Sequence, residues 1–157
     1  MTPTAPDAPP LVAGPLDPWR ASARIGRQLG AWAVASIVLG GALVAFADGA
    51  AARAFGLQGL VWGAIDGAIA IAGWVALRRA HARGAVADPQ CAPPERRRLR
   101  RLLWINAGLD VGYVTVALLL LALWRTPEGL GHGLGVLVQG GFLLAFDAVH
   151  ARRLRER

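Results

Sequence analysis

Four long apolar runs, separated by short polar or basic segments, dominate the chain. They cover residues 29–47, 56–77, 102–124 and 133–150 of 157. A helix needs about 20 predominantly apolar residues to cross a bilayer core of about 30 Å. The pattern therefore predicts an all-α polytopic membrane protein with four transmembrane helices in two hairpins.

The segments that flank these runs complete the predicted organisation. Residues 1–18 hold six of the ten prolines and predict a disordered tail. Residues 19–157 then form one transmembrane domain, with short turns at 48–55 and 125–132 and one substantial basic loop at 78–101. A cleaved signal peptide is an alternative for the first run, because Ala45-Phe46-Ala47 matches the small-x-small cleavage pattern. The late charged region and the long apolar core favour a retained helix.

Arginine supplies all 17 of the Lys and Arg residues, and its distribution is uneven. Only Arg53 and Arg125 lie in the turns that follow the first and third runs. Segments rich in positive charge stay on the cytoplasmic side of a membrane. The pattern predicts cytoplasmic N and C termini and a cytoplasmic basic loop. This topology accounts for the net charge of +7, so we expect the lipid bilayer as partner and no nucleic acid.

The third run carries polar residues at helical spacing inside a membrane-length segment. Asn106 and Asp110 lie four residues apart, and Tyr113 lies one turn further along the same face. Ionisable groups at such depth are costly unless they face the interior of a bundle. The other runs supply partners, and the predicted polar seam comprises Asp66, Asn106, Asp110, Tyr113, Gln139, Asp147 and His150.

Depth along the helices divides this seam. At a rise of 1.5 Å per residue, Asp66 and Asp110 lie about 16 and 12 Å from the cytoplasmic helix ends. Asn106, Asp147 and His150 lie within about 6 Å of those ends. We expect a deep layer around the two aspartates and a shallow layer that lines a cavity open to the cytoplasm.

The deep aspartates carry the functional hypothesis. Two carboxyls in a low dielectric cannot both stay ionised at little cost, so one is expected to be protonated, to share a proton or to face a bound cation. This predicts a proton- or cation-linked transporter or channel. The alternative is a protonated aspartate bonded to Asn106 or Tyr113, which joins helices in a non-catalytic scaffold or accessory subunit and contributes about 0.6–2 kcal/mol.

No catalytic, metal or cofactor constellation is complete in the sequence. Cys91 is the only cysteine, and no Cys/His spacing predicts a zinc site. His132 and His150 lie about 27 Å apart on one helix and cannot ligate one haem. Asp147 and His150 at i, i+3 supply only two metal ligands. We expect neither a metal nor a cofactor, and an embedded enzyme is the least supported hypothesis.

Glycines at four-residue spacing predict close helix packing. They are Gly59, Gly63 and Gly67 on the second run and Gly108 and Gly112 on the third. The last two lie roughly opposite the polar face, where core packing within the monomer is the simpler expectation and a homodimer contact is the alternative. The glycines of segment 131–135 lack the Lys-Ser/Thr of a phosphate-binding loop and predict a flexible lead into the fourth helix.

The two predicted hairpins share an internal similarity. GLQGLVWG at residues 56–63 aligns with GLGVLVQG at residues 133–140, with five of eight positions identical. A duplicated hairpin gives a parallel repeat of the kind that some transporters use. Chance similarity between apolar segments is the alternative.

Two segments carry a resemblance to a known family. Residues 106–113 (NAGLDVGY) and residues 139–147 (QGGFLLAFD) resemble a family of uncharacterised small four-span bacterial membrane proteins, over about residues 25 to 150. Members often carry Asn where this chain has Ser36 and Asp66. The resemblance implies a four-helix fold in the bacterial inner (plasma) membrane and no particular activity.

Overall fold

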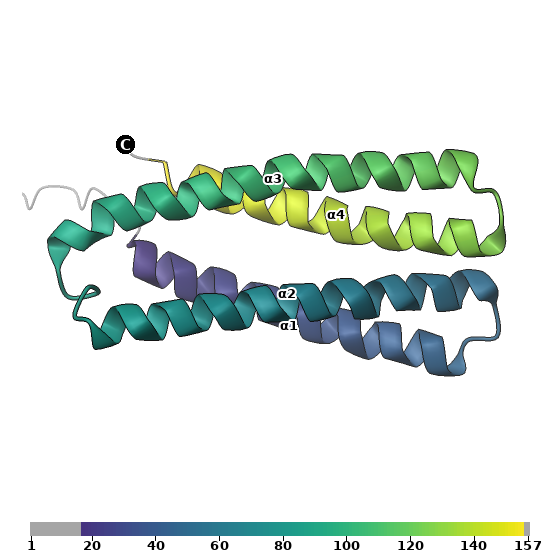
Figure 1. The fold of residues 1–157 in the computed structure, drawn as a ribbon, viewed down its shortest axis with the longest axis horizontal. Coiled ribbons are helices and arrows are strands. Elements are labelled where there is room, and N and C mark those ends of the chain that lie inside the picture. Colours follow the sequence, from purple (N-terminus) through teal and green to yellow (C-terminus); the bar gives the residue numbers. More distant parts are fainter. Residues whose placement is uncertain (1–16, 156–157) are drawn as a thin grey trace, which may run out of the picture.

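The computed structural model describes residues 17–155, which contain four long helices (Figure 1). They are α1 (Pro18–Phe46), α2 (Ala50–Ala82), α3 (Ala92–Leu123) and α4 (Pro127–Arg153), with a short 3-10 helix, η1 (Pro89–Cys91), before α3. Each long helix contains an apolar stretch sufficient to cross a membrane, and the described residues form no strand. The prediction of an all-α protein with four membrane-spanning helices is confirmed.

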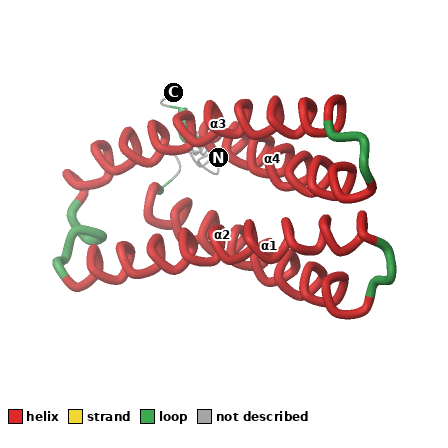
Figure 2. The backbone as a smooth tube through the Cα atoms, turned by 45° about the vertical axis from the view of Figure 1, so that its right-hand side comes forward, coloured by secondary structure: helices red, strands yellow, loops and turns green. Residues whose placement is uncertain are grey.

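The helices pair as two antiparallel hairpins, α1–α2 and α3–α4, and α2 of the first hairpin packs against α4 of the second (Figures 1 and 2). The turns of both hairpins lie at one end of the bundle, here called the turn end. The start of α1, the α2–α3 connection and the end of α4 lie at the other. We call this the basic end, because every described arginine except Arg53 and Arg125 lies there or on the adjoining helix turns.

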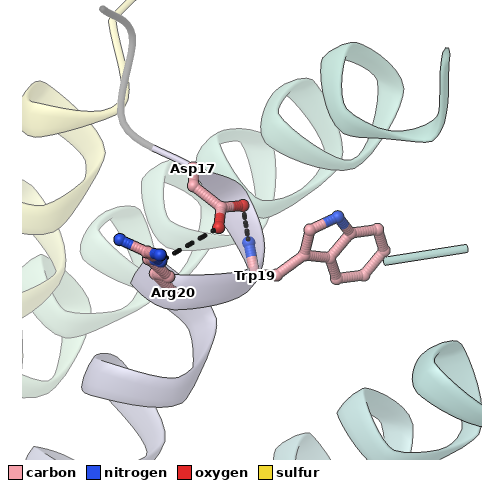
Figure 3. A network of polar contacts seen from close by, with 3 residues as sticks. All are labelled: Asp17, Trp19 and Arg20. Atoms are coloured by element: carbon pink, nitrogen blue, oxygen red, sulfur yellow. Dashed lines mark hydrogen bonds and ion pairs between the residues drawn. The ribbon is translucent and has the colours of Figure 1, made fainter. Parts of the chain in front are cut away.

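Local signals define the start of α1. Asp17 is its N-cap: one carboxylate oxygen accepts a hydrogen bond from the backbone N–H of Trp19 at 3.0 Å, and the other lies 3.6 Å from Nε of Arg20 (Figure 3). Pro18 follows at the first helical position, where its missing N–H is not needed. These two residues of the expected tail therefore belong to the helix start, and residues 1–16 lie outside the described part of the chain.

The helices extend beyond the apolar runs, so the connections are shorter than expected. Residues 78–82 continue α2 and residues 92–101 begin α3, which reduces the expected basic loop at 78–101 to residues 83–91. Arginine is a good helix former, and the prolines at 93 and 94 are tolerated in a first turn. Gly84, with φ of 71°, supplies the left-handed conformation that follows α2.

The glycine-rich segment 131–135 is helical and packed, so the prediction of a flexible lead is wrong. A side chain at Gly131 would overlap the carbonyl oxygen of Ala51 on α2. A Cβ at Gly135 would lie 2.6 Å from Cβ of Gln58, also on α2. The two glycines, which have no side chain, therefore allow α4 to approach α2 closely near the turn end.

Glycines also set the distance between α1 and α2. A Cβ at Gly63 would lie 2.9 Å from the carbonyl oxygen of Ala33, and a Cβ at Gly59 would lie 3.0 Å from that of Ser36. Gly67 makes only an ordinary contact, at 3.7 Å from Cβ of Ala33. The first two glycines therefore lie where the backbones approach closely, whereas Gly67 is not required there.

Gly108 and Gly112 lie on a face of α3 that the monomer does not cover. A Cβ at either position would meet no other described residue within 4 Å. The expected core packing of these two glycines within the monomer is therefore wrong. Their face points away from the other three helices.

The two hairpins repeat the same helix-pair register. Gly63 faces Ile37 in the first hairpin, and Gly140 faces Val114 in the second. Likewise, Gly56 faces Val44, and Gly133 faces Leu121. Each residue of the second hairpin lies 77 positions after its counterpart in the first. The aligned sequence segments therefore occupy equivalent places, as a duplicated hairpin requires.

Candidate functional site

A cavity of about 140 Å³ lies between the two hairpins. Asp66 of α2, Asp110 of α3 and Asp147 of α4 line it, and each is at most 6% exposed. Asn106 and Tyr113 of α3 also line it. We call this space the carboxyl cavity; its other walls are mostly aliphatic.

The three aspartates lie at neighbouring depths when counted from the turn end: Asp66, Asp110 and Asp147 are 16, 13 and 20 residues from the turn-end limits of α2, α3 and α4, about 24, 20 and 30 Å. Asp66 is 16 residues from either end of α2, about 24 Å along the helix and hence near its middle. Asp147 is six residues from the end of α4, about 9 Å from the basic end. The cavity therefore brings Asn106 and Asp147 of the expected shallow layer together with the deep aspartates.

Hydrogen bonds leave part of this carboxyl cluster unsatisfied. Oδ2 of Asp66 and Oδ2 of Asp110 are buried and have no hydrogen-bond partner among the described residues. The three carboxyls are close enough to interact electrostatically, and the Asn106 side chain pairs with Asp147. An isolated ionised carboxylate in such a place would be very costly.

An aromatic pair closes the turn-end side of the cavity. The rings of Trp62 and Tyr113 pack edge to face, with centroids 4.7 Å apart. Each ring lies about one helical turn toward the turn end from the aspartate of its own helix. Tyr113 thus forms a wall with Trp62, and no hydrogen bond from it to an aspartate is present in the described structure.

The rim of the cavity includes exposed aliphatic side chains. Ile65 and Ile69 of α2 and Leu109 of α3 line it, and they are 45%, 51% and 57% exposed. These residues flank the space between α2 and α3 at membrane depth. Asn106, which lies about one turn toward the basic end from Asp110 on α3, also lines the cavity and is exposed.

Gln139 and His150 do not join the carboxyl cavity. Oε1 of Gln139 accepts a hydrogen bond from Nε1 of Trp32 at 2.7 Å, and its Nε2 donates to Oγ of Ser36 at 3.1 Å. Nε2 of His150 lies 3.0 Å from Oε1 of Gln28. Both residues therefore face α1, and the single seam predicted on α4 is in fact two stripes.

Helical geometry explains this division. Gln139 and His150 are 11 residues apart, close to three full turns, so they share one face of α4. At 100° per residue, Asp147 is rotated by about 60° from His150 and by about 80° from Gln139. Sequence reasoning missed Gln28, although Gln28, Trp32 and Ser36 at four-residue spacing signal a polar stripe on α1.

The cluster does not form a metal-binding group. Among residues 17–155, no three His, Cys, Asp or Glu side chains come close enough to hold one metal ion. Asp147 and His150 face different neighbours, so their i, i+3 spacing does not create a shared site. The arrangement instead offers carboxyl groups that can exchange protons or contact a small cation at an otherwise apolar depth.

Comparisons with known proteins identify a family and no activity. No curated protein and no solved structure matches the chain significantly. A family model matches residues 28–148, which include parts of all four helices and all three aspartates of the carboxyl cavity. Since this match covers more than half of the sequence, the chain belongs to the family of unknown function DUF6992.

Proposed function

We propose that this protein is a small membrane transporter or channel that moves protons or another small cation through the carboxyl cavity. The observation that carries the proposal is the pair of buried, unpartnered oxygens on Asp66 and Asp110. They belong to different hairpins and line the same cavity near the middle of the bundle. Transporters built from internal repeats likewise bind their substrates and coupling ions near the bilayer midplane, at the interface between the repeats.

The chemistry of the cluster supports a bound positive charge. Three neighbouring carboxyls in a low dielectric cannot all stay negatively charged on their own. Either at least one of them is protonated, or a cation lies among them. Asp66 and Asp110 would hold that proton or cation. Asp147, about 9 Å from the end of α4, would exchange it with solvent at the basic end. Asn106 would orient Asp147, and Tyr113 would limit access from the turn end.

We also propose that the basic end faces the cytoplasm of a bacterial cell and that the protein lies in the inner membrane. The arginine distribution supports this orientation through the positive-inside rule. The carboxyl cavity would then exchange protons with the cytoplasm through Asp147.

Flux measurements on reconstituted protein test the transport proposal. We expect liposomes that contain the protein to acidify faster than protein-free liposomes under an imposed membrane potential, followed with an internal pH-sensitive dye. Asp66→Asn and Asp110→Asn should each lower this flux about tenfold or more, since about 1.4 kcal/mol of lost ion stabilisation gives that factor. Parallel runs with Na⁺ and K⁺ gradients distinguish a proton from another cation.

Asp48→Asn is the matched control, because Asp48 lies at the turn end and does not line the carboxyl cavity. Its flux should equal that of the wild type. Proton and cation flux no higher than in protein-free liposomes would contradict the proposal, as would unchanged flux in both cavity variants.

A separate observation favours a second function. The uncovered glycines of α3, Gly108 and Gly112, permit close approach of another transmembrane helix. On this basis the chain would act as a homodimer or as a non-catalytic scaffold or accessory subunit.

A further inference from the structure

A larger groove lies on the opposite side of the bundle from the carboxyl cavity's rim, between α1 and α4. Its volume is about 650 Å³, within the range of small-molecule pockets. Trp32, Phe142 and Phe146 line its apolar part, and Gln28, His150 and Arg153 line its polar part. We call it the α1–α4 groove. None of these residues lines the carboxyl cavity.

The apolar part has a floor of stacked aromatic rings. The rings of Trp32 and Phe142 stack with centroids 3.8 Å apart and planes 12° apart. Phe146 continues the row, 5.6 Å from Phe142. Nε1 of Trp32 already donates to Gln139, so the floor offers a ligand only apolar surface. Small residues on either side (Ala31, Ala35 and Ala145) leave the floor uncovered.

The polar part presents donors and positive charge. Nδ1 of His150 donates to the carbonyl oxygen of Phe146 at 2.7 Å, and its Nε2 contacts Oε1 of Gln28. Gln28 has two amide N–H groups, and in either orientation of the amide this contact uses at most one of them, so an N–H donor remains. Arg153 is exposed and pairs with no described carboxylate. Among residues 17–155, no acidic side chain lines the groove, and His150 and Arg153 are its only titratable groups.

The depth of the groove suits a molecule with a charged head and an apolar tail. Arg153 is the last residue of α4, at the basic end. From Gln28 to Ala35 the groove follows α1 for seven residues, about 10 Å toward the membrane interior. Its donors therefore lie at the level of lipid headgroups, and its aromatic floor lies at the level of acyl chains.

We propose that the α1–α4 groove binds an anionic phospholipid. The lipid phosphate accepts hydrogen bonds from the guanidinium of Arg153 and the amide of Gln28, and one acyl chain lies on Trp32, Phe142 and Phe146. Arginine matches phosphate geometry through two parallel N–H donors. Basic pockets between transmembrane helices at the cytoplasmic side bind acidic headgroups in the same way.

Native mass spectrometry of the detergent-solubilised protein tests this site. The protein is titrated with phosphatidylglycerol and, separately, with phosphatidylcholine of identical acyl chains. We expect phosphatidylglycerol to bind more tightly, with one lipid retained per chain. Arg153→Gln should weaken that binding about tenfold, the loss expected for one charge-assisted hydrogen bond. Arg152→Gln is the matched control, since Arg152 is exposed and does not line the groove.

A second variant tests the acyl-chain part without altering charge. Ala35→Phe places a ring over the aromatic floor and should weaken binding of both lipids, while the helical circular dichroism stays that of the wild type. Equal losses in Arg152→Gln and Arg153→Gln would overturn the proposal, because they indicate nonspecific charge attraction. Complete displacement by inorganic phosphate would overturn it in favour of a free anion. Occupation of the groove only by a second copy of the chain would also overturn it.

Discussion

At the residue scale, glycines, which have no side chain, decide how closely these helices approach one another. Gly40 and Gly56 face each other so tightly that a Cβ on the first would lie 2.5 Å from the carbonyl oxygen of the second. Other glycines on the same helices face open space, as Gly73 does. A glycine is therefore required at some positions and not at others, and the presence of a neighbouring helix decides which.

The contrast between Gly56 and Gly73 gives a paired stability prediction. Gly56→Ala places a Cβ 2.7 Å from both the Gly40 carbonyl oxygen and Cβ of Leu43, which should lower the free energy of unfolding by about 1–3 kcal/mol. Gly73→Ala meets nothing within 4 Å and should raise it by about 0.5–1 kcal/mol, because alanine is the better helix former. Thermal melting in detergent measures both, and a Gly56→Ala protein that melts no lower than the wild type would refute this account of the contact.

At the element scale, α3 has two polar or small-residue faces with different environments. Asp110 is buried against the other helices, whereas Gly108 and Gly112 are uncovered. In α4, similarly, Asp147 faces the carboxyl cavity while Gln139 and His150 face α1. Different faces of one helix thus have different environments, as expected for a helix in a bundle.

The uncovered face of α3 gives a prediction about association. Gly108→Leu combined with Gly112→Leu should weaken self-association about tenfold, because larger side chains prevent close approach of a second helix. Sedimentation in detergent measures the monomer–dimer equilibrium. Gly26→Leu is the control, since Gly26 also faces open space but lies on α1. Unchanged association in the double variant would mean that this face contacts only lipid.

At the scale of the whole molecule, the arginines and the helix connections give the bundle a polarity. Both termini of the described chain and the α2–α3 connection lie at the basic end, and the two short turns lie at the other (Figure 1). Cys91, the only cysteine, ends η1 in that connection and is partly buried. It is a natural marker for which side of the membrane the basic end faces.

Thiol labelling tests the proposed orientation. A membrane-impermeant maleimide should label Cys91 in inverted vesicles and leave it unlabelled in intact cells with a permeabilised outer membrane. In a Cys91→Ser, Asp48→Cys variant the pattern should reverse, because Asp48 lies at the turn end. Equal labelling of Cys91 from both sides would contradict a single orientation.

The pH dependence of this labelling follows from the surroundings of Cys91. Partial burial and the neighbouring Asp88 carboxylate, 3.5 Å from the thiol, raise the pKa of Cys91. The reactive thiolate is therefore scarcer at neutral pH than for a free cysteine, and labelling should accelerate as the pH rises. Asp88→Asn should speed labelling at neutral pH.

The sequence by itself determined the four membrane spans, their hairpin order and the identity of the buried carboxyls. Long apolar runs admit few structures in a bilayer, because every backbone N–H and C=O group must be paired within a helix. Asp66 and Asp110 stood out for the same reason: a carboxyl inside such a run must find an interior position.

Only the tertiary structure decided which polar residues meet. Helical spacing placed Gln139, Asp147 and His150 on one broad face of α4, but a rotation of about 60–80° between them directs Asp147 to the carboxyl cavity and the other two to α1. Spacing likewise could not tell the packed Gly63 from the uncovered Gly108. A helix pattern specifies directions around one axis, whereas contacts depend on the rotation and separation of two helices, which the packing of the whole bundle sets.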